Sequence, residues 1–357
     1  MSQIAAPPAG DGPPPRPRRR NALKQPYVRR GLAVIACALI IGVTFATSYV
    51  GGLHQPTFHG VSIAVAGPAA LARKLGSGPE LSVDVVPSAQ AAIRRIDDRR
   101  DFGAVVATPT GITVLTAQAG GPAVADALAA TLPSALRSAT GGHIPIRVSD
   151  VKPLPANDPT GASTFYLVVS LVVSNYLGAI LFAVAFGSKL TRQTLVPRLL
   201  IAVFIALVVA LGEVGITNAI GPLSGHFLTL ALAGFLLGAA VSVVTLCLGS
   251  LLGVVGTTIA ILIFVVLGNP ASGGGFPFPL LPGLWRVLGP YTPSGAGVTL
   301  VRNSVYFGGH GTGFPVAVLA VWLAVALALT VFSVRLRPIG LRMKSDYDRL
   351  ATNLGTV

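Results

Sequence analysis

Apolar runs separated by short polar segments make up most of the chain. The first run, residues 31–50, carries no charge, and five further runs follow it. Those five lie near residues 165–186, 199–219, 227–248, 252–267 and 314–334. About 20 apolar residues in a helix cross a hydrocarbon core of about 30 Å, whereas the apolar core of a signal peptide is usually about 7–15 residues long. The pattern therefore predicts six transmembrane helices, the first of which is retained.

The third and fourth of those five runs are continuous, because no charged residue occurs between positions 227 and 268. A single helix of this length would be about 60 Å long, twice the thickness of the hydrocarbon core. The chain must therefore turn back, and LGSLLG at 248–253 is the expected place for the turn. We accordingly predict a transmembrane domain of five helices over residues 159–336.

Residues 51–158 have a different pattern. Short stretches of strand length lie at 61–67, 81–87, 102–108, 111–118 and 143–151, with helical stretches at 88–100 and 121–139. Strands that alternate with helices are typical of an α/β domain. We therefore predict an extracytoplasmic α/β domain between the first and second transmembrane helices, with Pro133 expected to kink or split its last helix.

The composition supports a membrane protein. Of the 357 residues, 52% are hydrophobic and only 11% are charged, whereas about a quarter of the residues in a soluble domain are charged. The net charge of +14 does not indicate a nucleic-acid partner, because the excess of basic residues lies beside the apolar runs and not on the face of a soluble fold. The partner expected from this composition is the lipid bilayer.

The Lys and Arg residues predict the orientation of the chain. Seven lie in residues 1–30, three in the loop 188–198 and five after the last apolar run, whereas the short loops on the other side contain two. Short loops rich in Lys and Arg stay in the cytoplasm. We therefore expect a multi-pass membrane protein with both termini in the cytoplasm: a disordered basic tail at 1–30, a tail at 337–357, and an outer interfacial loop at 268–313.

Three stretches resemble a known family of membrane proteins. SYVGGLHQPTFHGVSIAVAG follows the first run, PLPANDPTGASTFYLVVSLVVSNYLG leads into the second, and LGNPASGGGFPFPLLPGLWRVLGPYTPSGAGVTLVRNSVYFGG precedes the last. In this order they are similar to the permease subunits of type-two ABC exporters, in the branch that includes the phage-infection-protein-like membrane proteins. The resemblance implies a first span, a large extracytoplasmic domain and then five spans.

The resemblance also implies a function. The chain would be a permease-like subunit that exports a lipid or an amphipathic compound, as a homodimer or heterodimer, with a separate ATPase. The sequence has no G-x-x-x-x-G-K-[ST] phosphate loop, so ATP hydrolysis by that chemistry is not expected of this chain. The candidate ATPase-docking loop contains Lys189, Arg192 and Arg198, and the basic residues 21–30 would add to the same surface.

Polar residues inside the predicted spans are candidates for a transport path. Glu213 is the one acidic residue in a span, where a charge costs about 2.5–3.5 kcal/mol. It indicates a proton or cation site or a polar lining for a substrate, or else a carboxylate near the outer helix end that reaches headgroups or water. Asn175 and Tyr176 lie in the middle of another span, where Asn175 either bonds to a neighbouring helix or contacts the substrate.

The segment 268–297 is rich in proline and glycine, so it cannot form one regular helix, and irregular backbone cannot face lipid. Trp285 and Tyr291 favour the interface between membrane and water. Together with Arg286 they form a candidate outer gate over the helices. The alternative is a linker that the aromatic residues merely anchor. Ser294 is the expected cap of the helix that follows.

The sequence predicts no catalytic, cofactor or metal site. It has no nucleophile elbow or zinc-protease helix, and its five histidines are not spaced as a metal site requires. Enzymatic activity is therefore not expected. Two alternative functions stay open: a non-transporting cell-surface protein whose outer domain binds an extracellular ligand or a phage, and a proton-coupled transporter that uses Glu213.

Overall fold

The computed structural model describes residues 26–142 and 144–354 of a chain that separates into two compact units, residues 1–44 and 45–357. Helix α1 (Pro26–Leu53) begins inside the predicted basic tail, most of which, residues 1–25, lies outside the described residues. At the other terminus the predicted tail is helical as far as it is described, because α11 (Gly313–Leu354) continues past the last apolar run.

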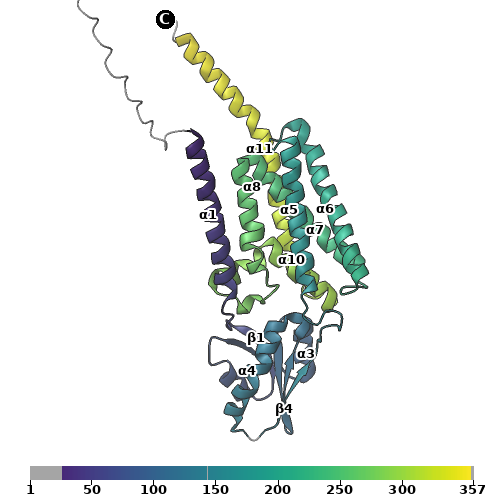
Figure 1. Cartoon of the computed structure of the whole chain (residues 1–357). Helices are drawn as coiled ribbons and strands as arrows, with labels where there is room; N and C mark the ends of the chain where they lie inside the picture. The colour runs from purple at the N-terminus through teal and green to yellow at the C-terminus, as the bar shows by residue number, and fades with distance from the viewer. Residues whose placement is uncertain (1–25, 143, 355–357) are drawn as a thin grey trace, which may run out of the picture. The chain divides into compact units, whose positions relative to one another are not determined.

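Four described helices are long and apolar enough to cross a membrane (Figure 1). They are α5 (Ser163–Phe186), α6 (Arg192–Ile220), α7 (Phe227–Leu252) and the part Gly313–Arg335 of α11. Two shorter apolar helical segments, Ala38–Leu53 and Val254–Leu267, match the first and fifth predicted spans. The chain is therefore a mostly helical membrane protein with an added α/β domain.

Helix α7 is the central helix of the bundle and packs against α5, α6, α10 (Pro293–Tyr306) and α11. In its apolar window 67% of the residues are buried, against 22–33% in the other three spans. Small residues make this burial possible, because they let helix backbones approach closely. Gly234 lies against Leu171 of α5 and Ala210 of α6, and Gly238 lies against Asn175 of α5.

The chain turns at Gly253 between α7 and α8 (Val254–Ile261), where the prediction placed a turn. The φ angle of Gly253 is +61°, a conformation that glycine adopts without steric cost. Helix α8 then packs back on the end of α7, with Gly256 against the carbonyl of Leu248. A π-helical segment, η3 (Leu262–Leu267), continues α8 towards the α/β domain.

The α/β domain is a five-stranded mixed sheet with helices on both faces (Figure 1). Its strands are β1 (Val61–Ala66), β2 (Leu81–Val85), β3 (Gly103–Thr108), β4 (Gly111–Thr116) and β5 (Ile146–Asp150), in the order β2-β1-β3-β4-β5. Neighbouring strands are parallel except in the hairpin of β3 and β4, where Gly103 is opposite Thr116. All five predicted strands are confirmed.

Alternation along the strands separates two cores. Residues such as Ile63 and Val65 face α2 (Ala69–Leu75) and α4 (Pro122–Thr140), whereas Ala64 and Ala66 face α3 (Ala89–Asp97). This follows from the two-residue period of a strand. The smaller core against α3 is lined largely by alanine, so that helix lies close to the sheet.

Pro133 was expected to kink or split its helix, and it does not split it, because α4 is one helix with Pro133 inside it. Proline removes one hydrogen bond of the helix. Leu128, Leu132 and Leu136, spaced four residues apart, are each at most 1% exposed in the larger core. Their burial holds α4 together across the missing bond.

The segment predicted as an outer interfacial loop at 268–313 has two parts, which corrects that prediction. Its first part consists of short 3-10 turns and the helix α9; its second part is α10, a buried helix of the bundle. The bounds of the short elements are Pro270–Ser272 (η4), Phe278–Leu280 (η5), Gly283–Leu288 (α9) and Gly289–Tyr291 (η6). The cap of α10 is Thr292, whose Oγ1 accepts from the backbone N–H of Gly295 at 3.0 Å; Ser294 lies inside the first turn.

The first part of this segment completes the α/β domain. Leu280 is 3% exposed and belongs to the core between the sheet and α4. The backbone N–H of His59 donates to the carbonyl of Pro279 at 2.9 Å, and Pro277 packs on Gly121. We call residues 276–281 the strap, because they tie the helix bundle to the domain.

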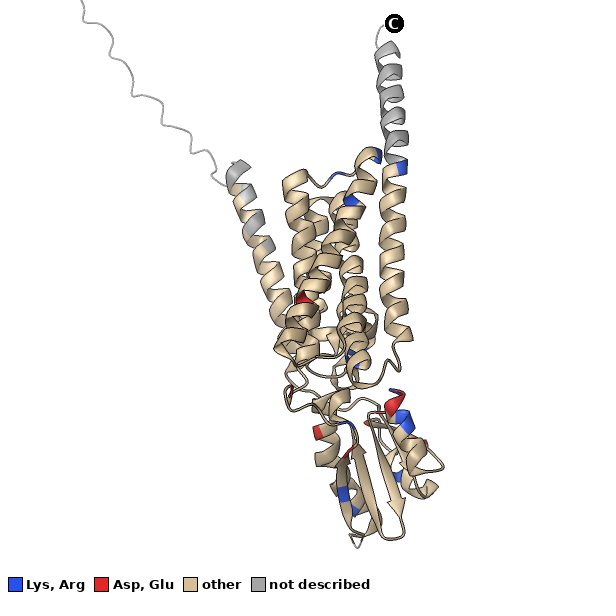
Figure 2. Ribbon diagram, turned by 90° about the vertical axis from the view of Figure 1, so that its right-hand side faces the viewer, with Lys and Arg blue, Asp and Glu red and all other residues tan. Residues whose placement is uncertain are grey.

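The end of the sheet at which β3 begins and β4 ends faces α10. Arg99, shortly before β3, bonds to Asn303 of α10, and the turn η2 (Gln118–Gly120) after β4 contacts the same helix. The carboxyl ends of the parallel strands β1, β2 and β3 therefore lie at the opposite end of the sheet. Among the coloured residues, charged ones lie mainly in the domain and at the far ends of the helices, so that the middle of the bundle is almost free of them (Figure 2).

Candidate functional site

An apolar pocket of about 240 Å³ lies at the end of the bundle next to the α/β domain, which we call the domain side. It is bounded by η3, α9 and α11, and all its lining side chains except that of Thr292 are aliphatic or aromatic. They are Ile263, Leu267, Ala271, Leu284, Trp285, Leu288, Tyr291, Thr292 and Trp322. We call this the gate pocket, because it contains two of the three predicted gate residues.

Hydrogen bonds position the aromatic side chains of the gate pocket. Trp285 Nε1 donates to Ser48 Oγ at 3.2 Å, and Trp322 Nε1 donates to the carbonyl of Tyr291 at 2.8 Å. The ring of Tyr291 packs edge-on against Phe314, with 5.6 Å between centroids. Arg286, the third predicted gate residue, does not line the pocket. Trp322 was missed, because a tryptophan inside an apolar run gives no sign of what it faces.

Helix α9 presents apolar side chains outwards. Leu284, Val287 and Leu288 are 55%, 59% and 46% exposed. An exposed apolar helix next to Trp and Tyr is typical of the membrane–water interface. The gate pocket thus lies where a lipid chain has access to it.

Asn175 is fully buried and joins α5 to α7. Its Nδ2 donates to the carbonyl of Leu171 at 2.8 Å, and its Oδ1 accepts from Ser242 Oγ at 3.1 Å. Of the two interpretations from the sequence, this geometry matches the bond to a neighbouring helix. Tyr176 packs half-buried against the core of the bundle.

Glu213 belongs to α6. It lies in a groove of about 370 Å³ between α5 and α6, on a different side of α5 from Asn175. Its Oε1 accepts a hydrogen bond from Ser174 Oγ at 2.6 Å, while its Oε2 is buried and has no hydrogen-bond partner. Neither Asn175 nor Tyr176 lines this groove. The three residues predicted for a transport path therefore do not line one cavity.

The basic loop predicted to dock an ATPase lies at the opposite end of the bundle. Arg198 is used within the chain, because its guanidinium donates to the carbonyls of Phe186 and Gly187 at 2.7 and 2.6 Å and so caps α5. The side chains of Lys189 and Arg192 are exposed. Two of the three residues are thus available to a partner.

Two arginines, Arg302 buried and Arg99 half-buried, connect the α/β domain to the bundle, and the sequence did not single them out. Arg302 of α10 is 5% exposed and donates to the carbonyls of Gly273 and Gly274 at 3.2 and 3.1 Å. Arg99 donates to Asn303 Oδ1 at 3.0 Å, and its guanidinium lies 4.4 Å from the ring centre of Phe307.

Burial has an electrostatic consequence for both arginines. Desolvation lowers the pKa of Arg99 to about 9, with a further contribution from the charge of Arg302, and desolvation lowers the pKa of Arg302 to about 10. No described carboxylate forms an ion pair with either guanidinium. Carbonyl groups and aromatic rings therefore satisfy these cations. In the sequence, Arg302 is a single arginine in an otherwise apolar segment, and this signal could have identified it.

Asp158 and Tyr306 extend this contact to the start of α5. Tyr306 donates its hydroxyl proton to Asp158 Oδ2 at 3.1 Å, and Asp158 also accepts from the backbone N–H of Ser163 at 3.3 Å. Burial raises the pKa of Tyr306, and the nearby charge of Asp158 raises it further. We call Arg99, Asp158, Arg302, Asn303 and Tyr306 the polar hub.

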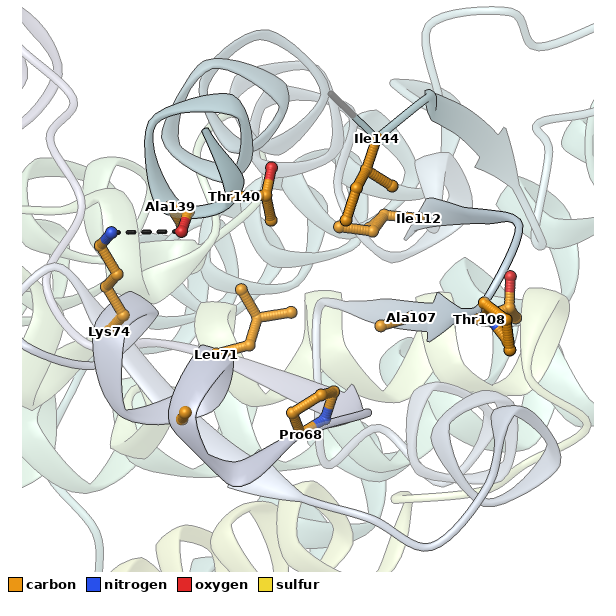
Figure 3. A pocket seen from close by; sticks show the side chains of 11 residues that line it. Pro68, Leu71, Lys74, Ala107, Thr108, Ile112, Ala139, Thr140 and Ile144 are labelled. Atoms are coloured by element: carbon orange, nitrogen blue, oxygen red, sulfur yellow. Dashed lines mark hydrogen bonds between the residues drawn. The ribbon is translucent and has the colours of Figure 1, made fainter. Parts of the chain in front are cut away.

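A second pocket, of about 510 Å³, lies on the α/β domain at the edge away from α10 (Figure 3). Apolar side chains such as Leu71, Ile112 and Ile144 line most of it. Lys74 borders it, and its ammonium donates to the carbonyl of Ala139 at 3.2 Å, which joins α2 to the end of α4. We call it the outer pocket.

Among the side chains that the structure describes, no group of three or more from His, Cys, Asp and Glu is arranged to hold a metal ion. The candidate sites are therefore two apolar pockets, a groove with a carboxylate, and an exposed basic loop. Their chemistry is that of binding apolar or amphipathic molecules.

Comparison with known proteins gives one match. No curated protein and no solved structure matches the chain. The model of the family described as "Protein of unknown function (DUF3533)" matches residues 106–328, from the end of β3 through the strap and α10 into α11. Because this match covers more than half of the sequence, the chain belongs to the DUF3533 family.

Proposed function

We propose that this protein is the membrane-embedded, permease-like subunit of an ABC-type exporter that moves a lipid or another amphipathic compound, with a separate ATPase as the source of energy. The gate pocket carries this proposal, because it is apolar, aromatic and next to an outward-facing apolar helix. At about 240 Å³ it is smaller than an ordinary drug-sized site of about 300 Å³ or more, which suits part of an alkyl chain.

The proposed place of the protein is a bacterial plasma membrane, crossed six times, with both termini in the cytoplasm and the α/β domain outside. The distribution of Lys and Arg supports this orientation. The position of Lys189 and Arg192 also supports it, because they lie at the end of the bundle opposite the domain side. An ATPase would dock there through acidic residues.

A pocket-filling substitution tests the export proposal. Leu288→Trp places a larger ring in the gate pocket, whereas Val287→Trp adds the same ring next to it on α9, outside the lining. In vesicles prepared from cells, we expect extrusion of a fluorescent phospholipid analogue to be lost with Leu288→Trp and kept with Val287→Trp. Equal extrusion by both variants and the wild type would exclude the gate pocket from the path.

Partner and orientation need separate measurements. Purification of the full chain from its native membranes should recover an ATPase subunit, and recovery of a stable complex without one counts against the exporter. A single cysteine at the exposed position 189 should react with a membrane-impermeant maleimide only from inside the cell. A single cysteine at the exposed position 73 should react with it only from outside. The reverse pattern would contradict the proposed orientation.

The outer pocket favours a second candidate function, a non-transporting cell-surface protein that binds an extracellular ligand or a phage. It is about twice as large as the gate pocket and lies away from the bundle. Ala70→Trp would fill it from its exposed rim. If a cellular phenotype of the protein is lost with Ala70→Trp and unaffected by Leu288→Trp, the surface-binding function is preferred to export.

A further inference from the structure

The groove around Glu213 combines an apolar surface with one unsatisfied carboxylate oxygen. Ser174 occupies Oε1, and Oε2 is buried without a partner. Glu213 lies seven residues before Ile220, the last residue of α6, and so about 10 Å along the helix from the domain side. The carboxylate is therefore below the level of the helix ends, in the groove between α5 and α6.

Nothing in the described part of the chain neutralises this carboxylate. The ion pairs found there are Arg95–Asp84, Arg95–Asp101 and Lys152–Asp97, all in the α/β domain. A buried carboxylate oxygen without a partner is costly in an apolar environment, and a charge within a membrane normally faces a cavity or a partner. The groove thus has a place for a hydrogen-bond donor with a positive charge.

The surroundings of Glu213 indicate the rest of the occupant. Tyr166, Ile216 and Ile220 line the groove and are 65%, 63% and 74% exposed. Apolar side chains continue along the same face of α6 towards its other end, because Val209 and Ile205 lie four and eight residues before Glu213, and both are half-buried. An alkyl chain extending from Glu213 would lie along this face.

A second copy of the protein does not have the required chemistry. Two copies related by a two-fold axis over this groove would present the same surface to each other, so each would bring its own Glu213. Two carboxylates would then approach each other in an apolar contact, which is unfavourable. Charge complementarity selects a cationic partner instead.

We propose that the groove between α5 and α6 binds an amphiphile with a primary ammonium headgroup, which donates to Glu213 Oε2 while its alkyl chain lies along α6. Ser174 positions the carboxylate through its hydrogen bond to Oε1. This inference deepens the proposed function and rests on it in one respect only, namely that amine-bearing amphiphiles are the exported class. The binding itself requires no transport.

The test uses the full chain in nanodiscs of phosphatidylcholine, with nitroxide-labelled stearylamine and the equally labelled stearyl alcohol as probes. Electron paramagnetic resonance measures the fraction of each probe that the protein immobilises. A charge-assisted hydrogen bond predicts about tenfold tighter association of the amine than of the alcohol. Glu213→Gln, which keeps the size of the side chain, should abolish this preference. Glu80→Gln, the same change at an exposed site of the α/β domain, should retain it.

Thermal unfolding of both variants must match the wild type. If Glu213→Gln does not fold, Ser174→Ala provides a second variant, and we expect it to reduce the preference for the amine in part. Equal binding of amine and alcohol by the wild type, or an unchanged preference in Glu213→Gln, overturns the proposal. Disulfide-linked dimers formed efficiently by Ser170→Cys would also overturn it, because a second copy would cover the groove. Amine binding without any extrusion of lipid analogues would sustain it while refuting the exporter.

Discussion

Gly238 of α7 lies directly against the amide group of Asn175 on α5. A Cβ atom at this position would be 2.7 Å from Asn175 Nδ2, closer than real Cβ atoms come to their neighbours. Asn175 cannot move away without losing its bonds to Leu171 and Ser242. The fit of two helices thus depends on one missing methyl group.

We predict that Gly238→Ala destabilises the protein by about 1–3 kcal/mol, the usual cost of overpacking. Gly212→Ala is the matched control, because a Cβ there meets nothing within 4 Å, and alanine favours a helix over glycine by about 0.5–1 kcal/mol. Thermal unfolding in detergent measures both. Equal midpoints for the two variants would contradict this account of the contact between α5 and α7.

Tyr306 gives the polar hub a dependence on pH. Its pKa is raised in the folded protein, so above about pH 10, the ordinary pKa of tyrosine, the folded state holds a proton that the unfolded state has lost. Unfolding then releases a proton, and the free energy of unfolding falls as the pH rises. Below pH 10 this contribution is fully present.

Tyr306→Phe should therefore flatten the loss of stability at alkaline pH. The measurement is the midpoint of thermal unfolding between pH 8 and pH 11, with Tyr166→Phe as the control because Tyr166 is 65% exposed. We expect the wild type and the control to lose stability more steeply above pH 10 than Tyr306→Phe. Parallel curves for all three proteins would show that the bond from Tyr306 to Asp158 does not contribute.

The strap is a short irregular segment that supplies a core residue to a domain far from it in sequence. Leu280 packs with Leu128 and Leu132 of α4, and Pro279 accepts a backbone bond from His59. Its neighbour α9 instead turns Leu284 outwards, at 55% exposure. Two leucines four residues apart thus have different environments.

Leu280→Ala should cost about 2–5 kcal/mol of stability, as expected for a fully buried leucine, whereas Leu284→Ala should cost little. Hydrogen exchange of α4 and β4 in the full chain reports the effect, and we expect faster exchange with Leu280→Ala alone. If Leu284→Ala accelerates exchange in α4 as strongly, the strap does not have the role assigned to it.

Helices and strands with regular periods could be predicted from the sequence, and the irregular segments could not. The apolar runs located α5, α6, α7 and α11, and the alternation of short stretches located the sheet. Pro133 does not split α4, because burial of leucines on α4 outweighs one lost hydrogen bond. Ser294 was chosen as a cap by residue type, although Thr292 comes before the proline with which α10 begins.

The contact between the α/β domain and the bundle depends on Arg99, which connects residues about two hundred positions apart. Its guanidinium bonds to Asn303 and Gly120 and stacks on Phe307. The lowered pKa shows that the charge itself is disfavoured by burial, so this side chain contributes through its specific bonds more than through its charge.

Arg99→Ala should loosen this contact without unfolding either part. Loss of two hydrogen bonds worth about 1 kcal/mol each predicts roughly tenfold or greater acceleration of amide exchange in Gln118–Gly120. Arg73→Ala, at an exposed position of α2, should leave that exchange unchanged. Unchanged exchange in Arg99→Ala would mean that the polar hub does not hold the domain.

Little of the candidate site could be predicted, because its residues meet only in three dimensions. Aromatic type identified Trp285 and Tyr291, but not Trp322, which reaches the same pocket from α11. The position of Glu213 in a span was readable, whereas its bond to Ser174 of another helix was not. In the sequence, Arg99 is one of several charged residues in the stretch 88–100, and only the fold brings it to α10.

The strap also constrains how the protein is made. The α/β domain precedes α5, α6, α7 and α8 in the chain, yet Leu280, which closes its core, follows them. In the proposed orientation the domain has by then crossed the bilayer. Its core therefore lacks Leu280 until those helices have been inserted. During that interval the core of the domain is incomplete, and it closes only when the strap has been made.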